Sequence, residues 1–252
     1  MNRSHETGGT RSAARRLAAL SAPAWLAGML LGAQSVRADQ MIVTPAGHRT
    51  LVEHVMLPGG VVEEYDAYID RNGSRVKHGE YKRYYRNGDM RERITFVHGI
   101  EDGPFAVYQD GNIPLLEGRY VQGKLDGNVT RYFASGHKQR ELTYRVGTLE
   151  GPFVLYHEGG VISAMGTHAQ GKREGRYAEF HSNGQLRLEG TYVQGFLNGA
   201  IVMYSESGEA RAKGMLSRER VRGPWICLAA PGKPEMRRND CEGKQYWECA
   251  CD

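Results

Sequence analysis

The residues of this chain that are best suited to chemistry are its four cysteines, which all lie in the last 26 residues: Cys227, Cys241, Cys249 and Cys251. An even number of clustered cysteines is typical of a disulfide framework in an oxidising compartment. Cys249 and Cys251 are too close in sequence for an easy mutual bond, so we expect each to pair with Cys227 or Cys241, in an order that the sequence leaves open. The alternative, a four-cysteine zinc site, is disfavoured because the spacings lack the usual two pairs of close ligands.

Histidines and carboxylates offer a second kind of chemistry, metal binding or acid–base catalysis. His157 and His181 stand 24 residues apart. In a stack of β-hairpins of that length, equivalent positions lie about 10 Å apart, too far for one zinc ion with bonds of about 2.0–2.1 Å. Acidic pairs such as Glu63-Glu64 are expected in loops, with no basic or histidine partner at a motif spacing. The sequence has no nucleophile motif, phosphate-binding loop or zinc-protease signature. It therefore predicts a protein that is not an enzyme and needs no cofactor or metal.

The elements that must position these residues are set by a repeat of 24 residues. It is marked by seven glycines: Gly79, Gly103, Gly127, Gly151, Gly175, Gly199 and Gly223. Five positions after the first six of these glycines stands an aromatic ring, and these rings are Tyr84, Tyr108, Tyr132, Tyr156, Phe180 and Tyr204. A turn dipeptide such as Asn87-Gly88 follows, and then apolar residues alternate with polar ones. Each repeat is therefore predicted to be one β-hairpin, and the fold is predicted to be all-β, an elongated antiparallel solenoid of tandem hairpins.

The register within each hairpin is predicted from the residues that would face one another. A two-residue turn at the Asn-Gly type of dipeptide places the side chain two positions into a repeat opposite the one fifteen positions into it. In this pairing rings face glycines and a valine faces a leucine: Phe105 with Gly118, Phe153 with Gly166, Tyr177 with Gly190 and Val129 with Leu142. An aromatic side chain that covers a strand glycine is a known cross-strand arrangement. The pair of Tyr81 and Ile94 does not follow this pattern, because a large ring there faces a large side chain.

The unit from Gly175 to Gly195 resembles the bacterial variant of the MORN (membrane occupation and recognition nexus) repeat, which is found in proteins often labelled YwqK-like antitoxins. The resemblance covers about Tyr65 to Trp225. It implies a solenoid of hairpin repeats with a binding or scaffolding role, and it implies no catalytic residues.

Residues 1–38 resemble a secretory signal peptide. Arg11, Arg15 and Arg16 precede an uncharged stretch, 17–33, that is rich in Leu and Ala, and small residues before Asp39 suit cleavage. An uncleaved membrane anchor is the disfavoured alternative, because the stretch is short and holds a proline. The pattern predicts export to the periplasm or secretion.

The remaining chain is divided into three parts by the repeat. Residues 39–78 are expected to form an N-terminal cap with a degenerate repeat, 79–222 six tandem repeats, and 223–252 a Cys-rich C-terminal cap. Without the five arginines and the one acid of residues 1–38, basic and acidic residues are equal in number. This balance disfavours nucleic-acid binding, which needs a basic stripe, and it also disfavours attraction to anionic membrane lipid.

The six rings five positions into each repeat are the candidate binding surface. One interpretation is an aromatic ladder that packs from repeat to repeat in the core. The other is a shallow aromatic surface that holds a protein segment or a glycan chain, for which tyrosines supply rigid apolar faces with a polar tip. The leading prediction is an exported, non-enzymatic scaffold that binds a protein partner. A cell-wall or glycan-binding module is the alternative, and addition of a partner strand to a free sheet edge is a third route to binding.

Overall fold

The computed structural model describes the backbone of residues 35–43, 49–57, 60–228, 234–249 and 251, with side chains from residue 63 onward. Most of the predicted signal peptide therefore lies outside the described residues. Its predicted cleavage point, after Ala38, falls inside the first strand. No helix in this described part has the length and apolar character needed to cross a membrane.

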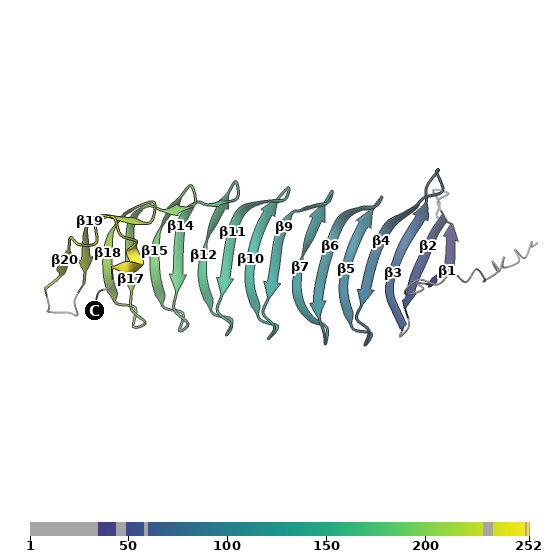
Figure 1. Cartoon of the computed structure of the whole chain (residues 1–252), viewed down its shortest axis with the longest axis horizontal. Coiled ribbons are helices and arrows are strands. Elements are labelled where there is room, and N and C mark those ends of the chain that lie inside the picture. Colours follow the sequence, from purple (N-terminus) through teal and green to yellow (C-terminus); the bar gives the residue numbers. More distant parts are fainter. Residues whose placement is uncertain (1–34, 44–48, 58–59, 229–233, 250, 252) are drawn as a thin grey trace, which may run out of the picture. The chain divides into compact units, whose positions relative to one another are not determined.

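The described strands form one antiparallel sheet, in which hairpins follow one another in chain order (Figure 1). The N-terminal strands are β1 (Ser35–Val43), β2 (Arg49–Leu57) and β3 (Gly60–Ile69). The hairpins are β4 (Arg75–Tyr84) with β5 (Met90–Val97), β6 (Ile100–Gln109) with β7 (Ile113–Val121), β9 (Gly127–Tyr132) with β10 (Lys138–Arg145), β11 (Thr148–Tyr156) with β12 (Ile162–Ala169), β14 (Gly175–Phe180) with β15 (Leu186–Val193), and β17 (Gly199–Tyr204) with β18 (Ala210–Ser217).

Shorter elements complete the sheet. Two-residue strands lie between hairpins: β8 (Lys124–Leu125), β13 (Lys172–Arg173) and β16 (Phe196–Leu197). The last hairpin is β19 (Arg220–Cys227) with β20 (Met236–Arg238), and a single 3₁₀ turn, η1, spans Tyr246–Glu248. The predicted all-β array of hairpin repeats is confirmed.

The predicted register is confirmed at every pair on which it was based. Phe105 lies opposite Gly118, and Phe153 lies opposite Gly166. The predicted two-residue turn is wrong in detail, because the ladder shifts by one residue just before it, as between Arg83 and Tyr84. This bulge lengthens the loop and leaves the pairing of the strand interiors unchanged. The true two-residue turns lie between repeats, where for example Val146 and Gly147 have φ of 49° and 82°, a type I′ geometry.

The side chains two positions into the repeats form the core. Tyr81, Phe105, Val129, Phe153, Tyr177, Ile201 and Trp225 are all buried. We call the side of the sheet that carries them the core face. Glycines give the rings room there: a Cβ added at Gly166 would lie 2.9 Å from Cε1 of Phe153. Buried residues from Phe153 to Cys249 form one continuous cluster on this face.

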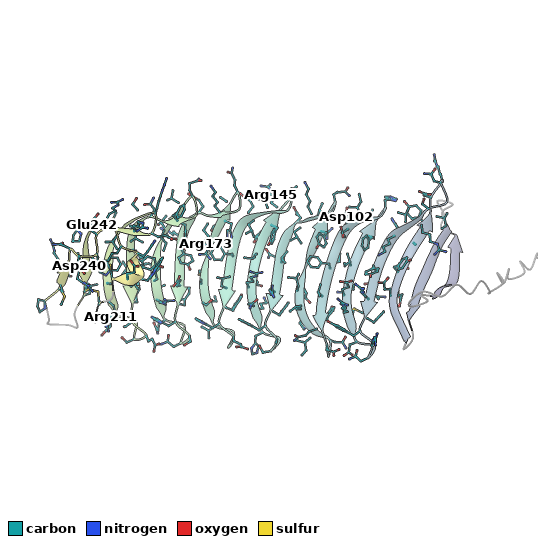
Figure 2. All side chains as sticks on the ribbon, viewed as in Figure 1. Asp102, Arg145, Arg173, Arg211, Asp240 and Glu242 are labelled. Carbon is teal, nitrogen blue, oxygen red and sulfur yellow. A yellow bond between two sulfur atoms is a disulfide. The ribbon has the colours of Figure 1, made fainter. Side chains whose placement is uncertain are left out.

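Contacts between successive turns join each repeat to the next along the side of the sheet where the strands of neighbouring repeats are connected. The acid that precedes a lead glycine accepts a hydrogen bond from the following turn. Gln122 Nε2 donates to Asp102 at 2.7 Å, and the backbone N–H of Gln170 donates to Glu150 at 2.7 Å. Figure 2 shows Asp102 on this side. Such bonds satisfy turn donors that water would otherwise have to reach, and they fix the spacing of the hairpins.

Carboxylates that were expected in loops lie instead in a strand. Glu63 and Glu64 belong to β3, and each has a basic partner on the neighbouring strand. Arg83 Nε lies 3.5 Å from Glu63, and Lys82 Nζ lies 3.4 Å from Glu64. The partners come from β4, so they were visible only once the β3–β4 register was known. These half-exposed pairs contribute little to stability.

Candidate binding surface

The six candidate rings lie on the side of the sheet opposite the core face. Alternation along β11 puts Phe153 and Tyr156 on different faces, because the extra residue of the bulge beside Tyr156 lies on the partner strand β12. All six rings (Tyr84, Tyr108, Tyr132, Tyr156, Phe180 and Tyr204) are half-buried. We call this side of the sheet the ring face. The rings are therefore neither part of the core nor fully exposed.

Most of the ring hydroxyls donate to a carboxylate of the preceding hairpin. Tyr132 donates to Glu117 at 2.7 Å, and Tyr156 donates to Glu141 in the same way. Tyr204 donates to Glu189. In each of these pairs the acid stands fifteen residues before the ring, which makes a ladder of Tyr–Glu bonds across the sheet. Tyr84 uses Glu64 at 3.4 Å, from a different phase.

The carboxylates change the acidity of these tyrosines. Burial, followed by the hydrogen bond to Glu117, raises the pKa of Tyr132 to about 12. For Tyr204 the hydrogen bond to Glu189 is the largest cause, and its pKa is also about 12. The pKa of Glu141 is lowered, mainly by Lys138 and then by Tyr156. The hydroxyls of Tyr132, Tyr156 and Tyr204 are thus protonated at neutral pH and donate to their carboxylates.

The ladder is interrupted at Tyr108, where the residue fifteen positions before the ring is Arg93, and again at Phe180. Phe180 has no hydroxyl, and the residue fifteen positions before it is Met165 in place of an acid. Met165 lies in β12 between Val154 and Ala178 of the neighbouring strands, and it is 43% exposed. Polar donor and polar acceptor are therefore replaced together, which leaves an apolar interval between the Tyr–Glu pairs of Tyr156 and Tyr204.

A shallow depression of about 780 Å³ lies over this interval. Met165, Ala178, Val202 and Pro152 contribute apolar surface to it, while Arg176 and Glu189 contribute charge. Its lining also includes Gly166, Gly190 and Ala200, whose small or absent side chains leave room above the sheet. Such a surface can accept an apolar side chain and offer polar contacts around it.

The two in-phase histidines are structural. Nε2 of His157 lies 3.0 Å from the backbone carbonyl of Phe180, and Nε2 of His181 lies 3.0 Å from that of Tyr204. Because a carbonyl only accepts, Nε2 carries the proton in both rings. Gln109 occupies the same phase and also donates to a carbonyl of the next repeat, at 2.9 Å. These side chains hold successive turns together.

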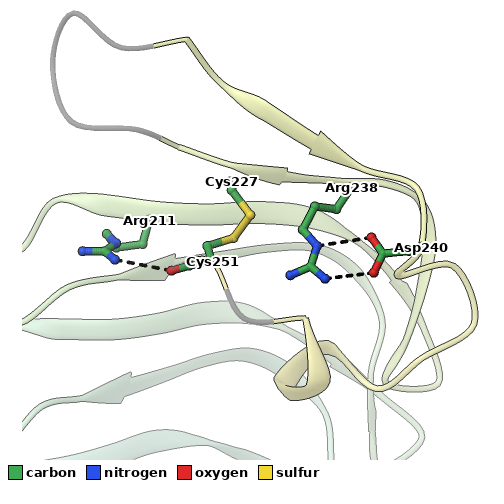
Figure 3. Close-up of a disulfide and its surroundings, with 5 residues drawn as sticks. All are labelled: Arg211, Cys227, Arg238, Asp240 and Cys251. Carbon is green, nitrogen blue, oxygen red and sulfur yellow. Dashed lines mark hydrogen bonds and ion pairs between the residues drawn. A yellow bond between two sulfur atoms is a disulfide. The ribbon is translucent and has the colours of Figure 1, made fainter.

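The C-terminal cysteines divide into one bonded and one unbonded pair. Cys227 and Cys251 form a disulfide, next to the ion pair of Arg238 and Asp240 (Figure 3). Cys241 and Cys249 are free and buried, so of the two expected bridges only this one is present. Burial, and then the neighbouring thiol of Cys241, raise the pKa of Cys249 to about 12, which makes it a poor nucleophile.

Within the described part of the chain, the cysteines do not form a metal site with their neighbours. Among the described residues no group of three or more His, Cys, Asp or Glu side chains could hold a metal ion. The C-terminal segment instead packs as a cap on the core face. Its Tyr246 and Cys249 contact the cluster that includes Leu188 and Trp225.

The fold and these repeated contacts define a protein of tandem β-hairpin repeats. Residues 77–98, 125–145 and 173–194 match the family described as the MORN repeat variant. The narrower assignment to YwqK-like proteins stays a prediction. No curated protein matches the chain.

One similar solved structure is the "Crystal structure of GtfA/B complex bound to UDP and GlcNAc", with 12% identity and a TM-score of 0.24. The match covers 53% of this chain and 24% of that one, so this chain spans about a quarter of its length. A likeness at this level carries no argument about fold or activity.

Sequence reasoning identified the column of rings but missed their partners. The acids Glu117, Glu141 and Glu189 were not singled out, although each stands fifteen residues before a tyrosine. A search for residue types that recur at a fixed distance from each ring would have found them. The same search would have found the exception at Phe180 and Met165.

Proposed function

We propose that this chain is an exported, non-enzymatic binding scaffold whose ring face docks a protein partner at the depression around Met165. The observation that carries this proposal is the paired loss of hydroxyl and carboxylate at Phe180 and Met165. If the ladder served the fold alone, this interval would be expected to resemble its neighbours. The hollow supplies what a protein interface places at its centre, namely apolar surface that water leaves readily.

The chemistry of the depression favours an apolar anchor with a polar rim. Arg176 is exposed at its border, and Glu189 is held in place by Tyr204. A partner side chain of the size of Leu or Phe would contact Met165 and Ala178, while its flanking polar groups reach these charges. Rigid strands on both sides mean that little ordering entropy is lost on binding.

Export and the absence of catalysis belong to the same proposal. The disulfide of Cys227 and Cys251 is compatible with an oxidising compartment, as is the charged and apolar pattern of residues 1–38. The ring-face tyrosines whose hydroxyls are bonded to glutamates have raised pKa values, so they stay protonated at neutral pH and are weak acids. A binding role requires the surface of these tyrosines and no reaction at their hydroxyls.

The test adds the missing Tyr–Glu pair to the ladder and removes no existing pair. Met165→Glu combined with Phe180→Tyr restores the pair found in neighbouring repeats, where Glu189 already lies between Ala178 and Val202. The variant is expected to fold, and the pKa of the tyrosine introduced at position 180 should be raised, as are those of Tyr156 and Tyr204. Val121→Glu adds a charge at an exposed apolar residue of β7, outside the depression, and serves as the matched control.

The measurement is capture of cross-linked proteins from an envelope extract, compared by mass spectrometry. We expect a protein that is held by the wild type and by Val121→Glu and is lost from the double variant. Equal capture by all three proteins would exclude the depression as the docking site. Sedimentation of the wild type with purified cell-wall polymer, abolished by the double variant, would favour the glycan alternative.

A further inference from the structure

A row of cross-strand pairs runs along the core face at the ends of the hairpins. It holds the residues four and thirteen positions into each repeat. In three of the hairpins the pair is complementary: Arg83 with Glu92, Val107 with Leu116, and Leu155 with Ala164. The guanidinium of Arg83 lies 3.6 Å from Glu92.

The hairpin of β9 and β10 breaks this rule, because Arg140 lies directly opposite Arg131. Like charges that face one another across a ladder are destabilising. Both side chains are exposed, and no hydrogen bond or ion pair to either guanidinium is found within the described part of the chain. The pair therefore lowers the stability of the protein, and no contact within the described part of the chain offsets this cost.

The surroundings of the pair are apolar along the row. Leu116 of β7 pairs with Arg131 on one side, and Leu155 of β11 pairs with Arg140 on the other. The next acids in the row are Glu92 on β5 and Glu179 on β14. Each is three strands away, about 14 Å at 4.8 Å per strand. Two unneutralised guanidinium groups thus stand between two aliphatic side chains.

We propose that Arg131 and Arg140 together bind a carboxylate of an acidic segment of a partner protein, laid across β7 to β11 on the core face. Guanidinium groups bind carboxylates through two parallel hydrogen bonds, and two of them can share one acidic cluster. Leu116 and Leu155 contact apolar residues on either side of the acid. This site lies on the opposite face from the depression and stands independently of it.

The chain itself shows what kind of element covers this row. Toward the C-terminus the same row continues through Leu188, Ala212 and Cys227, which are buried in the cluster that contains the chain's own C-terminal segment. That segment is irregular and includes a short 3₁₀ turn with Glu248. An acidic, partly apolar segment on β7 to β11 would continue this cover over the part of the row that the cap leaves open.

The test uses the full chain and a fluorescent peptide with two adjacent glutamates flanked by leucines. Its counterpart carries glutamine in place of both acids. We expect the acidic peptide to bind, with an affinity that falls as salt is added. Arg131→Gln and Arg140→Gln should each weaken binding about tenfold, because a charge-assisted hydrogen bond is lost. Arg119→Gln, at an exposed arginine of β7 that pairs with Pro104 on the ring face, should change affinity less than twofold.

A second measurement keeps the outcome clear if peptide binding is weak. At low ionic strength, Arg131→Gln should raise the melting temperature of the free protein, because the like-charge contact is removed, and the acidic peptide should raise that of the wild type alone. Equal peptide affinity in wild type and variants would overturn the proposal. So would binding only to phosphatidylserine vesicles or to inorganic phosphate with no response to the acidic peptide, or equal binding of the glutamine peptide.

Discussion

Replacing Gly214 by alanine tests the packing of the C-terminal hairpins most directly. A Cβ at this position would lie 2.5 Å from Cε3 and 2.8 Å from Cζ3 of Trp225. The indole is 0% exposed, so it has no free space into which it can turn. It would have to retreat by roughly 1 Å into the close-packed side chains of the buried cluster to which it belongs. Overpacking of this kind costs about 1–3 kcal/mol.

A matched control is available within the same sheet. Gly159 lies in a turn, outside the positive-φ region, and a Cβ there would meet nothing within 4 Å. Gly159→Ala should therefore be neutral, or more stable by about 0.4–1 kcal/mol because the unfolded chain loses freedom. Unfolding in urea, followed by tryptophan fluorescence and by far-ultraviolet circular dichroism, measures both variants against the wild type.

The comparison discriminates because both changes add the same methyl group to the same residue type. If Gly214→Ala proves as stable as Gly159→Ala, with an unchanged urea dependence, the ring does not lie tightly against the glycine. The C-terminal third of the core would then not consist of aromatic rings that rest on strand glycines. A lowered midpoint at constant slope would support that packing.

Substitutions at three positions and one labelling experiment test separate features of the structure. Val146 is a β-branched residue at φ 49° and 61% exposed, so Val146→Asn should raise the free energy of unfolding by about 0.5–1 kcal/mol in urea. Glu189→Gln should lower the pKa of Tyr204 from about 12 toward the ordinary tyrosine value of 10.0, as followed by tyrosinate absorbance. Since the folded pKa exceeds the unfolded one, the contribution of this bond is full below pH 10 and is lost as pH rises toward 12. His157→Ala should cost about 1 kcal/mol and His157→Gln much less, because glutamine can still donate to the next repeat. Iodoacetamide should label no thiol in the native protein and two after unfolding without reductant, and a labelled native protein would contradict the burial of both thiols.

The sequence was sufficient to predict the hairpin register because both halves of each pair belong to one repeat. Phe153 and Gly166 are separated by one short turn, so period-two patterning and residue size fix their pairing. The detail of the turn was wrong because the bulge beside Tyr84 leaves no mark that distinguishes it from an uninterrupted strand. Contacts inside a repeat were thus predictable, apart from their local irregularities.

Contacts between repeats were not predicted, for a physical reason. The hydroxyl of Tyr132 reaches Glu117 on the preceding hairpin, and that geometry depends on how neighbouring hairpins are offset. The pairing of Cys227 with Cys251 likewise depends on how the C-terminal segment folds back over the core face. Its path is not periodic, so the repeat gives no information about it. Each of these partners belongs to a different element from the residue it serves.

Specificity in such an array must come from the places where the repeat is broken. Identical hairpins offer identical surfaces every 24 residues, and a partner could slide among them with equal affinity. The ring face differs at Met165 and Phe180, and the core face differs at Arg131 and Arg140. Both departures remove a favourable internal contact while leaving the backbone register intact. Substitutions that restore the repeat at either place should therefore maintain or raise the stability of the protein while they remove binding. A substitution at a residue that serves the fold should instead lower the stability of the protein. This opposition between stability and binding separates the two roles whichever protein the partner is.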